Sequence, residues 1–394
     1  MIVNAPLRFP EDITYCLLGD SDLTRHLADL LALLRPAARF AGFVDEVPAE
    51  HHLVVAELAS EQAKTLFHER RNDPRLIVFP LPVDEMWSYW EFSRGFPGEV
   101  RYDGGLHIDS PDFLKYLASQ KRIDIDKAGN IQVPRGSYLV NLEDEVAANR
   151  ASIAEVAAVL SDERSRQVYE MIMAGEPQQH WAHYLGRVFG SIQYFDYLDF
   201  ADCQVVINGG VLGGYEIPFL ACHLPPGAQV HNVDPLGHAP LTAYVRPWLE
   251  AGLQSFHEHA VALENYTGSL ELPFDAEGEV SAWIKAMHPE APTVTFPCTT
   301  IDAFVAAEGL DRLDLIKLDL EGADANAIAG AANSIRRMRP QLAVSIYHFV
   351  PDFWQIPKAL IELCPDYDFH LEVYSYERWE TIFYAIPRER RAIS

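Results

Sequence analysis

The sequence predicts an α/β protein built from two Rossmann-like units, and three observations support this fold class. Apolar strands alternate with amphipathic helices over residues 13–80, which is the order of a parallel sheet covered by helices. A second alternation opens at residue 204, where an apolar strand runs into a glycine-rich turn and then a helix. The chain closes with DFHLEVYSYERWETIFYAIP, which reads as two strands around a short polar turn. A terminal hairpin after such units is unlike a plain dehydrogenase fold.

Length and charge limit the classes of function. The chain has 394 residues, more than one ordinary hydrophobic core needs, so two or three domains are expected. Hydrophobic residues make up 49% and charged residues 22%, as in folded soluble proteins. Lys and Arg total 31 against 57 Asp and Glu, a net charge of −26. Such a charge repels phosphate backbones and anionic lipid, so we expect no nucleic-acid and no membrane partner.

Cysteine usage and the first residues indicate a cytoplasmic protein. The five cysteines are scattered and include no CxxC pair, which argues against a disulfide framework or a structural zinc site. The segment MIVNAPLRFPEDITY lacks the basic and apolar blocks of a signal peptide. No stretch approaches the roughly 18 apolar residues of a membrane span. We therefore expect a cytoplasmic location.

Residues 1–135 are predicted to form an N-terminal Rossmann-like accessory domain. Strands are expected at 13–19, 38–46, 52–58 and 75–80, with helices at 21–34 and 60–70 between them. Ser21 is the expected N-cap of the first helix. The turn GDSDLT has one glycine where a dinucleotide fingerprint has three, while Asp45 ends the second strand as a ribose-binding acid would. Nucleotide binding and a scaffold role both stay open.

An aromatic segment and a helical connector follow. MWSYWEFSRGFPGEVRY, residues 86–102, is dense in rings, which serve either as flat faces for a sugar or polyketide or as core and interface. Residues 136–200 are predicted to be a helical connector, with a helix beginning at Ser161 and Asp162. The rings are Trp87, Tyr89, Trp90, Phe92 and Phe96.

Residues 201–394 form the predicted second α/β domain. The strand in QVVINGGVLGGYEIPFLACHL leads into glycines that include Gly210 and Gly214, and the next strand ends at Asp234, some twenty residues later. In such units the backbone at a glycine turn approaches a cofactor closely while the carboxylate takes ribose hydroxyls. An NAD-dependent oxidoreductase would share this turn and this acid.

The stretch LIKLDLEGADANAIAGA places charges on alternate positions of a buried-looking strand. Residues two apart point to the same face of a strand, so Lys317, Asp319 and Glu321 would line one side. Buried charge is costly unless it is paired or used. Gly322 then lets the chain turn closely into a helix. The charges are expected to face an active site at the carboxyl end of the sheet.

Residues 190–387 resemble the FkbM-type methyltransferases. The match is the run TTIDAFVAAEGLDRLDLIKLDLEGADANAIAGAANSIRRMRPQLAVSIYHFVPDFWQIP, which is similar to the family pattern T-x-D, K-x-D-x-E-G-A-E, R-P, Y-H, D and I-P. ETIFYAIP and SIQYFDYLDF also resemble family segments. The resemblance implies a class I Rossmann-like fold, S-adenosylmethionine as cofactor, and O-methylation of a sugar or secondary metabolite. Asn208 stands where the family has Asp, and Asp324 where it has the second Glu.

The resemblance and the chemistry together assign site residues. An acceptor alcohol holds its proton tightly, so a base or a metal helps methyl transfer, and His348 at the end of its strand is the expected base. Asp319 and Glu321 would hold Mg²⁺, contact the acceptor directly, or pair with Lys317 as a structural network. The resemblance also implies that Gln193 and Tyr194 close over the cofactor. The expected catalytic residues are His348, Asp319, Glu321 and Lys317, and the expected cofactor-binding residues are Asn208, Gly209, Gly210, Gly214, Asp234 and Gln193.

Other readings stay open. His257 and His259 have no third ligand at zinc spacing and are interpreted as solvent or core histidines. His348 would instead be structural if it capped a loop and bonded to Asp352. A non-catalytic scaffold with a weakened cofactor site is the other alternative to a methyltransferase. The expected partner is a small-molecule or glycosylated acceptor, and a homo-oligomer is one of the states that the sequence allows.

Overall fold

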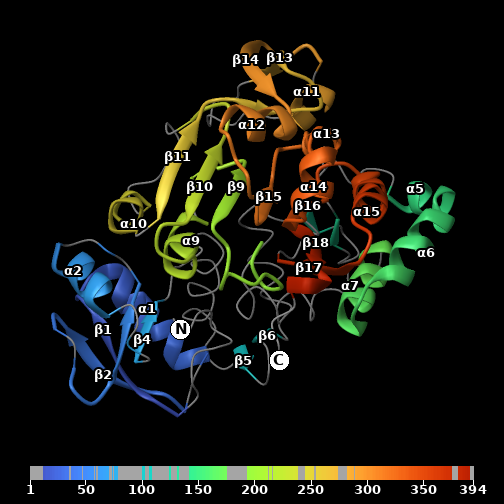
Figure 1. The fold of residues 1–394 in the computed structure, drawn as a ribbon. Helices are drawn as coiled ribbons and strands as arrows, with labels where there is room; N and C mark the ends of the chain where they lie inside the picture. The colour runs from blue at the N-terminus through green and yellow to red at the C-terminus, as the bar shows by residue number, and fades with distance from the viewer. Residues whose placement is uncertain are drawn as a thin grey trace.

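The computed structural model describes residues 12–78, 142–174, 193–237, 245–273, 282–374 and 380–390, apart from single residues and pairs within them, and four short strands between residues 100 and 132. Figure 1 shows a small N-terminal sheet beside a larger sheet that runs from yellow β11 to red β17. Both sheets carry helices, so the predicted α/β class is confirmed.

The N-terminal unit is a four-stranded parallel sheet in the order β2-β1-β3-β4. Its strands and helices follow the predicted alternation, and Thr24 donates its backbone N–H to Ser21 Oγ at 3.2 Å, which confirms Ser21 as the N-cap. The elements are β1 (Thr14–Leu18), α1 (Asp22–Leu34), β2 (Arg39–Val44), β3 (His52–Val55), α2 (Glu61–Arg70) and β4 (Leu76–Val78).

Two short antiparallel pairs are described farther along the chain. They are β5 (Val100–Tyr102) with β6 (Leu106–Ile108), and β7 (Asp124–Ile125) with β8 (Ile131–Gln132). The rings Trp87, Tyr89, Trp90, Phe92 and Phe96 lie outside the described residues. The choice between a ligand face and a core therefore stays a prediction.

The main sheet has seven strands in the order β11-β10-β9-β15-β16-β18-β17. The first five are parallel, and β18 runs antiparallel to both of its neighbours, which confirms the terminal hairpin. The strand order reverses between β9 and β15, and α/β sheets bind ligands in the crevice at such a point. The strands are β9 (Val205–Gly209), β10 (Gln229–Val233), β11 (Ser255–His259), β15 (Leu315–Leu318), β16 (Gln341–Ser345), β17 (Tyr367–Val373) and β18 (Thr381–Pro387).

Short helices connect these strands. The glycine-rich turn after β9 leads directly into α9, whose first turn contains Pro218, and a proline is tolerated there because its missing N–H would have no partner. The helices are α9 (Ile217–His223), α10 (Arg246–Ala251), α12 (Ile301–Ala307), α13 (Asp324–Ala329), α14 (Ala332–Met338) and α15 (Asp352–Leu363), and a 3₁₀ turn spans Arg388–Arg390.

The segment QSFHEHAVAL, residues 254–263, does not form one strand. The chain turns after His259, where Val261 donates its N–H to the His259 carbonyl at 3.0 Å. The tight turn sends β12 (Ala262–Leu263) into a separate three-stranded sheet with β14 (Thr293–Thr299) and β13 (Gly268–Pro273). This sheet and α11 (Ala282–Met287) lie over the top edge of the main sheet in Figure 1.

The predicted helical connector packs against the main sheet. It comprises α5 (Leu142–Ala148), α6 (Arg150–Val159) and α7 (Glu163–Ala174), and Figure 1 shows these green helices next to β17 and α15. Asp162 caps α7 by accepting the Ser165 N–H at 2.8 Å. Arg164 then pairs with the fully buried Glu372 at 2.6 Å. The helices thus complete the edge of the sheet.

The N-terminal unit contacts α10 through its helix α2. Phe67 packs edge-on against Trp248 with ring centroids 5.8 Å apart, and Lys64 Nζ lies 2.6 Å from Glu250 Oε2. Side chains of β1 also belong to the same buried cluster as the core of the main sheet. The two sheets therefore share a continuous apolar interior. In the part of the chain that the structure describes, no helix is long and apolar enough to cross a bilayer.

Candidate active site

The glycine turn after β9 lies against the segment after β15. Gly210, Gly213 and Gly214 all have positive φ, at 75°, 75° and 71°, a region that side chains other than glycine rarely adopt. A Cβ on Gly210 would stand 1.8 Å from the Asp319 carbonyl oxygen, so only glycine fits. The predicted cofactor turn and the predicted catalytic segment are in direct contact.

Asp234 follows β10 immediately and binds the glycine turn. Its Oδ2 accepts the Val211 N–H at 3.0 Å, and its Oδ1 accepts the Leu236 N–H at 2.8 Å. Each carboxylate oxygen has more than one acceptor site, so both keep capacity for a ligand hydroxyl. The predicted ribose acid therefore stands at the expected edge of the sheet.

Asn208 belongs to a polar row that crosses the sheet. It is paired in register with Asn232 on β10 and with Lys317 on β15. Its Nδ2 donates to Asn232 Oδ1 at 2.9 Å, and Asn232 Nδ2 donates to Glu258 at 2.6 Å. The Asn208 Oδ1 is buried and has no hydrogen-bond partner among the described residues. Asn208 and Gly209 thus lie inside the strand, just before the turn.

Lys317 supports the glycine turn. Its Nζ donates to the Gly210 carbonyl at 2.5 Å, lies 3.4 Å from Glu216 Oε1, and stands 4.6 Å from the centre of the Tyr194 ring. The prediction that Lys317, Asp319 and Glu321 share one strand face is wrong, because β15 ends at Leu318 and the alternation ends with it. Lys317 reaches the turn from the strand, while the two carboxylates follow the strand.

Asp319 is held by two tyrosine hydroxyls. Tyr194 donates to its Oδ2 at 2.5 Å, and Tyr347 donates to its Oδ1 at 3.1 Å. Burial alone raises the pKa of this carboxyl, but His348, Lys317 and the Tyr194 hydroxyl outweigh burial and lower it. Asp319 is therefore an anion at neutral pH, with a fixed orientation.

His348 lies three residues beyond β16, within a group of carboxylates. Its Nε2 is 3.3 Å from Asp319 Oδ1 and 3.6 Å from Glu321 Oε2, and its Nδ1 is 3.0 Å from Asp324 Oδ2. Burial would lower its pKa, but these carboxylates, Asp324 foremost, raise it to about 10. The ring therefore carries a positive charge at neutral pH in this arrangement.

The alternative pairing of His348 with Asp352 is wrong. Asp352 accepts the Phe349 N–H at 2.9 Å, whereas Asp324 is the carboxylate that faces the His348 ring. Burial and the nearby Asp324 raise the pKa of Asp352 to about 7. Asp324 was noticed in the sequence only as a departure from a family pattern. Its contact with His348 could not be inferred, because it depends on how α13 meets the end of β16.

Three residues around this group have positive φ although they are not glycine: Tyr194, Glu321 and Glu380, at 68°, 50° and 56°. Such backbone is strained and often occurs at functional sites. Gln193, predicted to close over the cofactor, donates its Nε2 to Glu380. Gln193 therefore bonds to the residue just before β18, whereas the next residue, Tyr194, bonds to Asp319.

A second histidine group lies on β10 and β11. His231 Nδ1 is 3.1 Å from His259 Nε2, and His259 Nδ1 is 3.9 Å from Glu308 Oε1. Burial and the neighbouring imidazoles lower the pKa of His231 to about 4. The sequence showed no third partner for His257 and His259, because His231 and Glu308 come from other elements. These residues form a histidine row against α12 instead of a set of isolated side chains.

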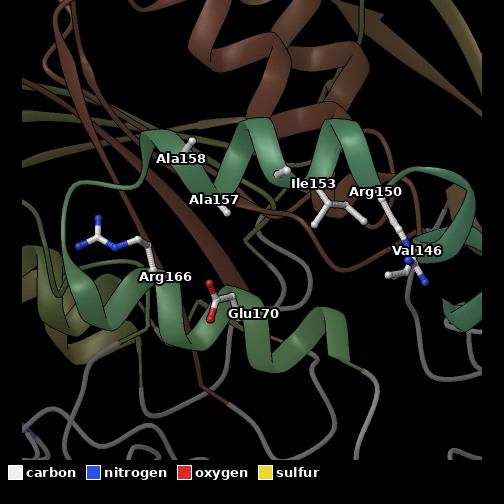
Figure 2. A pocket seen from close by; sticks show the side chains of 8 residues that line it. Val146, Arg150, Ile153, Ala157, Ala158, Arg166 and Glu170 are labelled. Atoms are coloured by element: carbon white, nitrogen blue, oxygen red, sulfur yellow. The ribbon is translucent and has the colours of Figure 1, made fainter.

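A separate pocket lies between the connector helices. In Figure 2, Ile153 and Ala157 lie on α6 above α7, which carries Arg166 and Glu170, and Arg150 lies beside Val146. The pocket has a volume of about 480 Å³ and a mostly apolar lining. Its lining residues include neither the glycine turn nor Asp319 and Glu321, so the pocket is not part of the candidate active site.

The comparisons with known proteins bear on this site. A family model described as the methyltransferase FkbM domain matches residues 214–378. The chain contains an FkbM methyltransferase domain. The match covers the glycine turn from Gly214 onward, Asp234, both carboxylates and His348. The match confirms the predicted resemblance to the FkbM family, whose members are S-adenosylmethionine-dependent methyltransferases.

Two examples illustrate the solved structures to which this chain is similar. One is the crystal structure of methyltransferase FkbM from Methylobacillus flagellatus KT, with 17% identity, 95% of this chain and 90% of that chain covered, and a TM-score of 0.47. The other is a putative O-methyltransferase from Klebsiella pneumoniae, with 14% identity, 63% and 90% covered, and a TM-score of 0.27. No curated protein sequence matches the chain.

The residues around the glycine turn fit the cofactor that the matched family implies. The glycine turn is bare of side chains at its positive-φ positions, Asp234 offers carboxylate oxygens, and the buried Asn208 Oδ1 is an acceptor without a partner among the described residues. These groups have the chemistry that a ribose and an amino group require. The family match gives no support to Mg²⁺.

Proposed function

We propose that the protein transfers the methyl group of S-adenosylmethionine to a hydroxyl oxygen of a sugar or secondary-metabolite acceptor, with Asp234, Gly210 and Gly214 at the cofactor. One observation carries this proposal, namely that the glycine turn rests on Asp319. The cofactor end and the acceptor end of the site are thus neighbours, as an in-line displacement requires. We expect the protein to act in the cytoplasm on a small-molecule or glycosylated acceptor.

The chemistry follows from this arrangement. When bound, the sulfonium cofactor supplies an activated methyl group, so that a new O–CH₃ bond forms as the S–CH₃ bond breaks. The hydroxyl proton passes to a carboxylate oxygen of Asp319 or Glu321, because the neighbouring His348 ring is already protonated, and the polar atoms of the three side chains lie within 4.8 Å of one another. Lys317 holds the glycine turn against this group. Positioning of this kind is a large part of catalysis for two reactants held together.

A methyl-transfer assay tests the proposal. The full-length protein is incubated with methyl-labelled S-adenosylmethionine and a panel of glycosides and polyhydroxylated metabolites, with S-adenosylhomocysteine release as the readout. We expect a methyl ether on at least one acceptor class, with the label on oxygen. Transfer only to nitrogen or sulfur acceptors would contradict the proposed oxygen chemistry.

A further inference from the structure

Three donor atoms converge beside the glycine turn in a way that suits a metal ion. His348 Nε2 lies 3.3 Å from Asp319 Oδ1 and 3.6 Å from Glu321 Oε2, and the three side chains offer ligand atoms that all lie within 4.8 Å of one another. Ligands bound about 2.1 Å from one ion are separated by roughly 3.0–3.4 Å in octahedral or tetrahedral geometry. Small side-chain adjustments would bring all three onto one centre.

The His348 ring supplies an independent indication of a ligand. The side chain is 1% exposed, yet neither ring nitrogen makes a well-formed hydrogen bond with a described residue. Buried polar atoms are normally satisfied, so each exception calls for an explanation. Nε2 lies 3.3 and 3.6 Å from two carboxylates, so a cation that displaces the Nε2 proton there would satisfy all three groups.

An outer carboxylate fixes the other side of the ring. Asp324 Oδ2 lies 3.0 Å from His348 Nδ1, and Asp324 itself accepts the Leu320 N–H at 3.0 Å. Histidines that bind metals usually present their second nitrogen to such a carboxylate, which sets the orientation of the ring. Asp324 is therefore placed as a positioning residue.

The local charge favours a divalent ion over a plain ion-pair network. Asp319, Glu321 and Asp324 surround one imidazole, while the nearby Lys317 already faces Glu216 at 3.4 Å. Buried charges are stable only when they are compensated. The three carboxylates carry more negative charge than one imidazole carries positive, so their field favours a bound dication at this point.

We propose that Asp319, Glu321 and His348 bind a divalent first-row transition-metal ion of the Mn²⁺ type, with Asp324 orienting the histidine. One imidazole nitrogen with two carboxylates suits such an ion better than Mg²⁺, which prefers oxygen ligands alone. Metal binding as such does not depend on the reaction. Its role rests on the proposed function, since the ion would lie at the acceptor end and polarise the acceptor hydroxyl.

The histidine row on β10 and β11 is the competing site. There, the two nitrogens of His259 face different partners, His231 at 3.1 Å and Glu308 at 3.9 Å. His259 therefore lies between its neighbours as in a hydrogen-bonded row, although the ligand atoms of this group also lie within 4.8 Å of one another. Glu308 supplies a matched control for the test.

The test is a titration of the metal-stripped full-length protein with Mn²⁺ in the absence of cofactor. Electron paramagnetic resonance of the free Mn²⁺ and calorimetry are the two readouts. We expect one saturable site, weakened at least about tenfold by Glu321→Gln and unchanged by Glu308→Gln. Glu321 is the chosen ligand because its side chain is 32% exposed, so the variant should fold. Absence of saturable binding, or its loss only in Glu308→Gln, would overturn the proposal.

Two further measurements keep the result specific. Pulsed resonance of the Mn²⁺ complex should show nitrogen coupling from one imidazole, which His348→Gln abolishes, and Asp324→Asn should weaken binding by about 10- to 100-fold. Circular dichroism verifies that each variant is folded. S-adenosylhomocysteine binding, measured in parallel without metal, separates the two claims. A protein that binds the cofactor but not Mn²⁺ contradicts only the metal site, and the reverse result contradicts only the proposed function.

Discussion

At the scale of single residues, the site depends on how Asp319 is held. Its carboxylate accepts hydrogen bonds from the hydroxyl groups of Tyr347, which follows β16, and of Tyr194, which precedes β9 and has a φ of 68°. The sequence identified Asp319, Glu321 and His348 from their spacing and family resemblance. It could not identify the function of Tyr347 or Asp324, because their partners lie 28 and 24 positions away through turns whose geometry the pattern does not encode.

Tyr194→Phe tests the importance of this hydroxyl. A hydrogen bond to a charged group contributes about 1.5–3 kcal/mol, so we expect kcat to fall by about tenfold or more while the fold is retained. Tyr266→Phe is the control, since this tyrosine is 43% exposed and its hydroxyl donates to the Ser269 carbonyl. Methyl-transfer kinetics give the answer, and unchanged kcat in Tyr194→Phe would show that the Asp319 contact has no catalytic role.

At the scale of elements, the strand order could be anticipated but not every strand. The alternation of apolar and helical segments predicted β9, β10, β15, β16 and the terminal hairpin, because each is a well-buried apolar run. The small sheet of β12, β13 and β14 was missed. Several residues of β13 and β14 are exposed, so hydrophobicity does not mark these strands, and only their pairing defines them.

Asp314 anchors the beginning of β9 and provides a pH-dependent prediction. Its Oδ2 accepts the N–H groups of Gln204 and Val205 at 2.8 and 3.0 Å, and Arg312 and Arg390 lie 2.7 and 2.5 Å away. Burial raises the pKa of Asp314, but the bonds from Arg312 and Arg390 outweigh it, so the folded pKa is lowered. This carboxylate therefore stabilises the fold above its unfolded pKa of about 3.9.

We expect Asp314→Asn to lower the free energy of unfolding by about 2 kcal/mol at pH 7. Because the folded pKa lies below the unfolded one, the difference from wild type should persist down to about pH 4 and shrink as the pH falls further through the folded pKa. Urea denaturation between pH 3 and pH 7 measures this difference in the free energy of unfolding. The lower limit of about pH 3 lies below the unfolded pKa of the carboxyl group. A difference that grows on acidification would contradict this assignment.

At the scale of the whole molecule, the two sheets form a continuous interior. Phe67 and Trp248 are both fully buried where α2 meets α10, and β1 shares its buried cluster with the main sheet. The sequence predicted two α/β units and the order of their elements. It could not predict that they dock through α10, since the contact joins residues about 180 positions apart without any local signal.

Phe67→Ala tests this shared interior. Removing a buried phenylalanine costs about 3–5 kcal/mol, and we expect a single calorimetric unfolding transition that shifts as a whole to lower temperature. Phe40→Ala, at a side chain that is 36% exposed, should have a much smaller effect. Two separate transitions, of which Phe67→Ala shifts only one, would show that the sheets unfold independently.

The most direct test of the account is calorimetric titration with S-adenosylhomocysteine of the wild-type protein, Asp234→Asn and Asp45→Asn. The two aspartates occupy corresponding places, since Asp234 follows β10, the second strand of the main sheet in sequence, and Asp45 follows β2, the second strand of the N-terminal sheet. We predict binding by the wild type, a loss of about tenfold or more in Asp234→Asn, and no change in Asp45→Asn. No binding by the folded wild type, or a loss confined to Asp45→Asn, would contradict a cofactor site at the β9 glycine turn.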